Sequence, residues 1–225
     1  MEIRSKTLLV TCYVVPLLFF AIMGGIFTSL MPEAKHTLIQ SMTVMGVSMG
    51  ALIGVPPSMI EVYSTDIKKM YIANGIPLCF GVIALVVSAF IHLMIMSIII
   101  FALAPIVFHA TIPSNIPLYF ITLALFVIVS LTISCVLGLA VKNQAKLTMY
   151  SQVVFLPSIM LSGIMFSAEL LPNFLESMGK LFPATWGYTL LIQKNIEVST
   201  FIPLVFILII SVFVSVQLLK KIRSE

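Results

Sequence analysis

Residues 77–108 read PLCFGVIALVVSAFIHLMIMSIIIFALAPIVF and contain no Asp, Glu, Lys or Arg. A helix needs roughly 20 mainly apolar residues to cross the hydrocarbon core of a bilayer. The stretch therefore predicts a membrane-spanning helix. Its one intramembrane ionisable side chain of note is His92. Because no acidic or basic residue accompanies it, we expect a neutral His92 that is hydrogen-bonded to a neighbouring helix.

Similar apolar stretches recur along the chain, in which 60% of the residues are hydrophobic and 9% are charged. This composition is typical of membrane proteins. At roughly 20 residues per crossing, 225 residues predict an all-α polytopic protein of about six spans, forming a single transmembrane domain over 1–225. We expect the first span to be retained and not cleaved as a signal peptide. The expected spans are 7–31, 38–55, 77–108, 116–141, 147–166 and 201–219.

The basic residues predict the orientation, because cytoplasmic loops carry an excess of Lys and Arg. With the N-terminus inside, nine basic residues fall on the cytoplasmic side and three on the other. Both termini are therefore expected in the cytoplasm. The cytoplasmic set is Arg4, Lys6, Lys68, Lys69, Lys142, Lys146, Lys220, Lys221 and Arg223, and the external set is Lys35, Lys180 and Lys194.

The connector between the second and third spans predicts an amphipathic helix over about 58–75, lying along the cytoplasmic surface. Ser58 and Glu61 have capping-box spacing, and Gly75 is placed to end the helix before a proline. Such a helix is either an interfacial anchor or a docking element for a cytoplasmic partner. The residues of interest for docking are Glu61, Ser64, Thr65, Lys68 and Lys69.

The external connector after the fifth span, about 167–195, remains apolar. Irregular backbone at membrane depth survives only where protein or water satisfies its polar groups. We therefore expect short half-helices that re-enter the outer leaflet, begun or broken by Pro172 and Pro183. The segment is either a lid of interfacial helices or an external gate.

The second span contains two overlapping patterns. Gly46, Ser48 and Gly50 spell GxSxG, a hydrolase motif that normally needs a strand-turn-helix context. Gly46, Gly50 and Gly54 form a GxxxGxxxG ridge, which allows another backbone to approach closely. We favour the packing interpretation, at a helix or subunit interface. Met42, Met45 and Met49 lie along the same helix and are either packing residues or the lining of an apolar path.

Several functional classes find no support in the sequence. The basic residues are scattered at span ends with no basic patch, which argues against nucleic acid as a partner. Neither the three cysteines nor the three histidines have metal-ligand spacing. GxxxxGK[ST] is absent, so any dependence on ATP is expected to come from another subunit.

The end of the fifth span and the following connector resemble a known family. The chain is similar to the permease subunits of type-2 ATP-binding-cassette (ABC) exporters over nearly its whole length. The resemblance rests on Phe155-Leu156-Pro157, Leu161-Ser162-Gly163, Phe166, Leu171-Pro172, Phe182-Pro183 and Thr185. The order of Glu61, Ser64-Thr65, Lys68 or Lys69, and Pro77 fits the family's cytoplasmic helix more loosely.

The resemblance implies a dimer of two permeases, identical or different, each docked to a cytoplasmic ABC ATPase through the helix after the second span. It implies that ATP and Mg are bound by the ATPase, that this chain binds no cofactor or metal, and that it has no catalytic residues. The path would lie between the permeases, lined by the second and fifth spans. The signature residues, Pro157 to Thr185, would form the external gate.

We therefore expect an ATP-driven exporter subunit in the plasma membrane that moves hydrophobic or amphipathic substrates, such as drugs, lipid-like compounds or peptides. One alternative is a stand-alone secondary transporter or channel, which would need more coupling residues than His92. The other is an intramembrane serine hydrolase, which would need Ser48 and His92 within hydrogen-bond reach.

Overall fold

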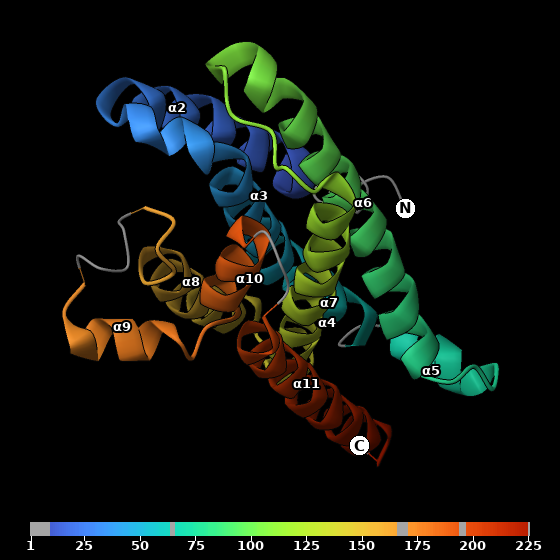
Figure 1. Cartoon of the computed structure of the whole chain (residues 1–225). Helices are drawn as coiled ribbons and strands as arrows, with labels where there is room; N and C mark the ends of the chain where they lie inside the picture. Colours follow the sequence, from blue (N-terminus) through green and yellow to red (C-terminus); the bar gives the residue numbers. More distant parts are fainter. Residues whose placement is uncertain (1–9, 64–65, 166–170, 194–196, 225) are drawn as a thin grey trace.

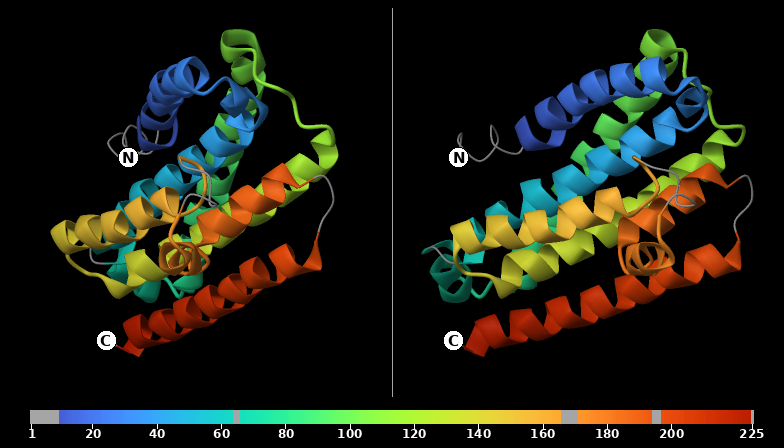
Figure 2. Two further views of the ribbon diagram at one scale, coloured as in Figure 1. Left: turned by 60° about the vertical axis from the view of Figure 1, so that its left-hand side comes forward. Right: turned by 90° about the vertical axis from the view of Figure 1, so that its left-hand side faces the viewer.

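The structure is a computed structural model that describes residues 10–63, 66–165, 171–193 and 197–224 (Figure 1). Across these residues every regular element is a helix. The long helices run side by side through the molecule, and the shorter helices α5, α9 and α10 lie toward their ends (Figures 1 and 2). The fold is therefore the all-helical membrane bundle that the apolar stretches predict.

Among the described residues, five helical runs are long and apolar enough to cross a membrane: Val10–Leu30, Leu38–Tyr63, Cys79–Phe108, Ile116–Ala140 and Val198–Ile222. The expected fifth span is occupied by α8 (Gln144–Met160), which has 17 residues. At about 1.5 Å per residue it is about 26 Å long, less than the roughly 30 Å of a hydrocarbon core. The described helices thus provide five clear spans and one shorter helix, α8, at the place of the expected fifth span.

The first run combines a π-helical turn, η1 (Val10–Val14), with α2 (Val15–Leu30). After the short 3-10 helix η2 (Pro32–His36), the second run consists of α3 (Leu38–Met49), a second π-helical turn, η3 (Gly50–Gly54), and α4 (Val55–Tyr63). The remaining elements are α5 (Asp66–Ala73), α6 (Cys79–Phe108), α7 (Ile116–Ala140), α8, α9 (Asn173–Gly179), α10 (Pro183–Ile192) and α11 (Val198–Ser224).

Local sequence marks several of these boundaries. The Asn115 side chain accepts a hydrogen bond from the Leu118 amide and caps α7, and the Asn143 side chain does the same for the Lys146 amide and α8. α6 ends where His109 takes the left-handed backbone conformation, with φ 54°. Each cap gives a hydrogen-bond partner to backbone amide or carbonyl groups that have none within the helix.

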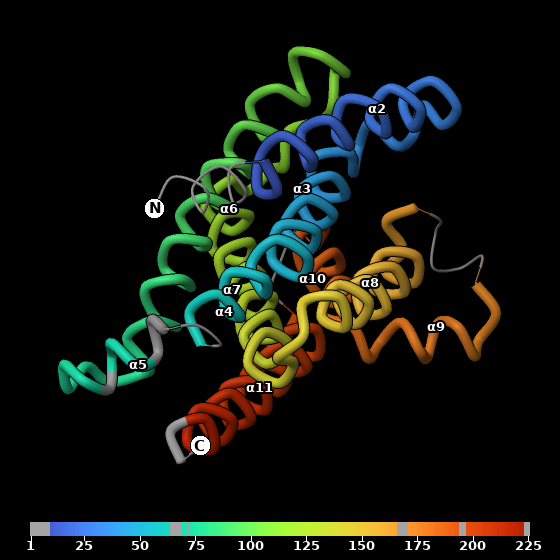
Figure 3. The backbone as a smooth tube through the Cα atoms, turned by 180° about the vertical axis from the view of Figure 1, so that it is seen from behind, coloured from blue at the N-terminus to red at the C-terminus, as the bar shows by residue number. Residues whose placement is uncertain are grey.

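The second run lies at the centre of the bundle. Every residue from Leu38 to Leu52 is buried. Helices α2, α6, α7, α8 and α10 all pack against α3, and α7, α6 and α8 pack against α4. Figure 3 shows this run passing between α6 and α8. By contrast, α2, α6 and α11 present many exposed large apolar side chains, as expected of helices that face lipid.

The two ends of the bundle differ in charge. The start of η1, helix α5, the α7–α8 connection and the end of α11 lie at one end (Figure 2). We call this the lysine-rich end, because its exposed lysines include Lys69, Lys142, Lys146, Lys220 and Lys221. The α2–α3 and α6–α7 connections lie at the opposite end.

Candidate functional site

The glycine ridge of the second run packs against helices of its own chain. A Cβ atom at Gly46 would lie 3.0 Å from Met96 Cε on α6, and one at Gly54 would lie 2.9 Å from Thr11 Cγ2 on η1. A Cβ at Gly50 would overlap the side chain of Leu93 on α6. The ridge therefore allows α6 and η1 to approach the second run closely. Its predicted part in a contact between subunits stays a prediction.

The three methionines of the second run are also internal. Met42, Met45 and Met49 are all buried within the chain. In this conformation they fill the centre of the bundle, a role suited to their flexible side chains. Whether they line a path in another conformation stays a prediction.

The second run changes its helical register just before two prolines, a feature that the sequence patterns above did not single out. Pro56 and Pro57 have no amide hydrogen, so they serve no carbonyl one turn earlier. The π-helical turn η3 precedes them, and the Ser134 hydroxyl on α7 donates to the Ala51 carbonyl within η3 at 2.7 Å. The signal in the sequence that could have predicted this change of register is the pair of consecutive prolines after an apolar helix.

Two π-helical turns meet at this position. Thr11 and Cys12 of η1 lie against Gly54, and Cys12 Sγ is 3.8 Å from a Cβ position at Gly50. Such turns widen a helix locally and are frequent at functional sites. The first and second runs thus cross where both depart from regular α-helical geometry.

At the lysine-rich end, the predicted docking residues follow directly from the second run. Glu61 is exposed near the end of α4, and Lys69 is exposed on α5, which also contains Lys68. Ser64 and Thr65 lie outside the described residues. Ser58 is buried in the second turn of α4 and does not begin a helix, because the second run continues unbroken into this segment.

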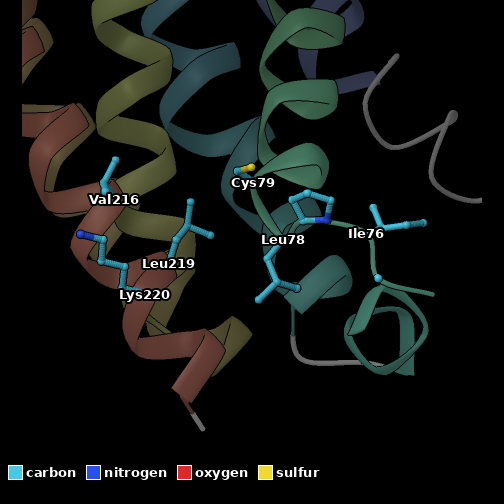
Figure 4. A pocket seen from close by; sticks show the side chains of 8 residues that line it. Ile76, Leu78, Cys79, Val216, Leu219 and Lys220 are labelled. Atoms are coloured by element: carbon cyan, nitrogen blue, oxygen red, sulfur yellow. The ribbon is translucent and has the colours of Figure 1, made fainter. Parts of the chain in front are cut away.

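The end of α4 is tied to the start of α6. The Tyr63 hydroxyl donates a buried hydrogen bond to the Leu78 carbonyl. Next to it lies a cavity of about 480 Å³ between the α5–α6 turn and α11. Ile76, Leu78 and Cys79 line one side, and Val216, Leu219 and Lys220 line the other (Figure 4).

At the opposite end, the signature residues form the turn that closes α8. Pro157 lies in the last turn of α8, and the Ser162 hydroxyl donates to the Ile159 carbonyl at 2.8 Å. Gly163 has φ 83°, a left-handed conformation that glycine adopts without strain. Leu161 is half-buried and Ser162 is buried, and Phe166 lies outside the described residues.

The remaining signature residues belong to α9 and α10. Leu171 is half-buried, Pro172 immediately precedes α9, Phe182 precedes α10, and Pro183 is the buried first residue of α10. The Thr185 hydroxyl donates to the Gly179 carbonyl at 2.6 Å. A Cβ at Gly179 would lie 2.6 Å from the Leu161 carbonyl oxygen. The α8 turn, α9 and α10 therefore form one packed unit.

His92 makes the kind of contact that its isolation predicts. The Tyr13 hydroxyl in η1 is 2.9 Å from His92 Nδ1, and the two rings pack edge to face. This confirms a hydrogen bond to a neighbouring helix. Ser48 is buried, and among the described residues it shares no hydrogen bond with His92. The geometry required of a serine hydrolase is therefore not present between these two residues.

Comparison with protein families identifies the class. The family model described as ABC-2 type transporter matches residues 3–196, more than half of the chain. The chain therefore belongs to the ABC-2 type transporter family and is a membrane permease of an ABC transporter. Members of this family are transport subunits whose ATP is hydrolysed by a partner, which implies a cytoplasmic ATPase. No curated protein and no solved structure gives a match.

Proposed function

We propose that this permease is the membrane subunit of an exporter that moves hydrophobic or amphipathic substrates, with ATP and Mg bound by a separate cytoplasmic ATPase. The observation that carries this proposal is the continuity of the second run from one end of the bundle to the other. This run stays helical from Leu38 to Tyr63, joins the docking segment at its lysine-rich end and packs against α10 at the other. A movement of α4 imposed by the ATPase would therefore reach α10 through packed helix.

The orientation follows from the charges. The exposed lysines of the lysine-rich end favour the cytoplasm, since positive residues are retained on that side. Both termini then lie in the cytoplasm, α4 and α5 are accessible to the ATPase, and α9 and α10 form an external re-entrant gate. The plasma membrane is the expected location.

We assign the fifth of six crossings to α8, and its composition supports a protein-facing role. Met149, Val153, Leu156 and Met160 form an exposed stripe at spacings of four and three residues, as in paired helices. Gln152 is also exposed on α8. A polar side chain is costly against lipid, so this helix is better placed against protein or water.

A second permease copy, identical or related, would supply that protein surface. Helix α3 is covered on all sides by its own chain, whereas α8 is open on one face. We propose that α8 faces the second copy and that the second run reaches the path only when the bundle opens at η3. The path would then be largely apolar, which suits hydrophobic and amphipathic substrates better than ions or sugars.

The test is co-purification of the ATPase. Glu61→Arg reverses a charge at the proposed docking surface, and Glu197→Arg makes the same change at an exposed position just before α11, at the opposite end of the bundle. We expect Glu61→Arg to reduce the amount of ATPase recovered with the chain about ten-fold or more. Glu197→Arg should recover the wild-type amount.

Both variants must also unfold at the wild-type temperature. Should one of them not fold, Lys69→Glu tests the same surface from α5. Recovery of ATPase at wild-type levels with both docking variants would contradict docking through α4 and α5. A wild-type chain that recovers no ABC ATPase from its native membranes would contradict the proposed function as a whole.

A further inference from the structure

The cavity of about 480 Å³ at the lysine-rich end occupies a gap between two membrane helices. Among the described elements, α11 packs mainly against α7 and α10 and has no comparable contact with α6. The α5–α6 turn and the start of α6 form one wall of the gap, and the end of α11 forms the other (Figure 4). Ligand sites in proteins usually measure roughly 300–1,000 Å³, so this gap is large enough to hold a ligand.

Both walls change from apolar to polar at the same level. On α11, Val216 is followed one turn later by Lys220, and both side chains line the cavity. On the other wall, α6 begins at Cys79, directly after the exposed turn at Gly75 and Ile76. Lysine side chains near the end of a membrane helix extend toward the headgroups. The cavity therefore lies at the boundary between the hydrocarbon core and the headgroup layer.

Exposed apolar side chains extend from the cavity toward the middle of the membrane. Ile83 lies one turn beyond Cys79 on α6 and is 57% exposed, and Val212 lies one turn beyond Val216 on α11 and is 44% exposed. Side chains four residues apart share one face of a helix. An acyl chain that enters the cavity therefore has an apolar surface to lie against on both helices.

The charge of the cavity is positive. Lys220 is exposed, and the described residues that line the cavity include no Asp or Glu. Basic pockets between membrane helices favour anionic lipid headgroups. Apolar walls inside the membrane and a lysine at the headgroup level together fit a phospholipid of net negative charge.

We propose that an anionic phospholipid binds in this cavity, with its phosphate at the Lys220 ammonium and an acyl chain between α6 and α11. The lipid would join the α5–α6 turn to α11, two parts of the chain that do not pack closely on each other. The leaflet follows from the proposed orientation, whereas binding itself is tested without the ATPase. A failure of lipid binding and a failure of ATPase docking are therefore separate results.

The experiment counts the lipids that the full-length chain retains in native mass spectrometry. The chain is released from detergent micelles that contain equal amounts of dioleoylphosphatidylglycerol, which is anionic, and dioleoylphosphatidylcholine, which has no net charge. The two probes have the same acyl chains, so a difference between them reports the headgroup. We expect the first retained lipid to be phosphatidylglycerol about five times as often as phosphatidylcholine.

Two pairs of variants separate this cavity from the rest of the surface. Lys220→Gln should abolish the preference for phosphatidylglycerol, whereas Lys146→Gln, which removes an exposed lysine at the same end but outside the cavity, should keep it. Val216→Trp keeps every charge and fills the cavity, so it should lower the retention of phosphatidylglycerol several-fold. Val107→Trp, at an exposed position near the other end of α6, should retain the wild-type amount.

Each variant must unfold at the wild-type temperature, and should Lys220→Gln not fold, Val216→Trp tests the same cavity. Equal retention of the two lipids by the wild-type chain would overturn the proposal. A preference that Lys220→Gln keeps, or that Lys146→Gln loses to the same extent, would also overturn it, because the lipid would then respond only to the general charge of this end.

Discussion

The Ser134 hydroxyl on α7 donates a 2.7 Å hydrogen bond to the backbone carbonyl of Ala51 in the second run. In the π register, the amide five residues after Ala51 would serve this carbonyl, but that residue is Pro56. A side chain from another helix thus replaces a bond that proline removes. The second run is therefore fixed to α7 at the point where its register changes.

Ser134→Ala removes this donor and leaves a buried carbonyl unpaired. We expect a loss of about 1–2 kcal/mol of stability, measured by thermal unfolding in mild detergent. Ser97→Ala is the matched control, because the Ser97 hydroxyl bonds to the Leu93 carbonyl within its own helix. Equal destabilisation by the two changes would contradict a special role for Ser134.

Gly50→Leu is expected to disturb the fold of a single chain. Leu93 occupies the space that a side chain at Gly50 needs, and Leu93 is fully buried. Overpacking of this kind costs about 1–3 kcal/mol or more. At Gly25 the nearest atom to a Cβ is Phe108 Cε1 at 3.9 Å, so Gly25→Leu should be tolerated. The measurement is the yield of folded protein in size-exclusion chromatography. If the Gly50→Leu chain is stable and fails only to dimerise, the glycine ridge lies at a subunit interface and the prediction is wrong.

Gly179→Ala should separate α9 from the end of α8. The added methyl group would lie 2.6 Å from the Leu161 carbonyl oxygen, and backbone cannot move aside as a flexible side chain can. We expect reduced transport, measured as substrate efflux from cells, with the ATPase still bound to the complex. Ser177→Ala, an exposed change on the same helix, should leave transport unchanged. Full transport by Gly179→Ala would mean that this contact does not shape the gate.

Cys79 should report the orientation. It is exposed at the lysine-rich end, whereas Cys12 and Cys135 are buried. A membrane-impermeant maleimide should therefore label Cys79 in inside-out vesicles and leave intact cells unlabelled. A Ser114→Cys variant at an exposed position on the opposite end should be labelled in intact cells. Labelling of Cys79 from outside would reverse the assignment of the two ends.

Much of the architecture was predictable, because membrane spans depend on length and hydrophobicity alone. The stretches 77–108 and 116–141 became α6 and α7 almost residue for residue. The segment after residue 55 was harder to predict. Ser58 and Glu61 resemble a helix start, but Pro56 and Pro57 are accommodated within a continuous run because Ser134 and the π turn compensate for their missing amides. Ser134 is distant in sequence from the prolines, so the local pattern does not reveal it.

The candidate site also has a part that the sequence predicted and a part that it did not. Its signature residues were identified from their own pattern, and Gly163 has the backbone conformation that explains one of them. The hydrogen bond between the Ser134 hydroxyl and the Ala51 carbonyl had no signal in the sequence, since a serine in an apolar stretch does not reveal which carbonyl its hydroxyl will reach.

The sequence by itself determined that the chain lies in a membrane, roughly where its long helices lie and which family it resembles, because each depends on the order and polarity of neighbouring residues. Only the tertiary structure decided which faces are covered. The glycine ridge packs against α6 and η1, whereas α8 has one face open. These outcomes depend on packing between helices that are far apart in sequence, where the available space and the remaining hydrogen-bond donors are set by the whole bundle.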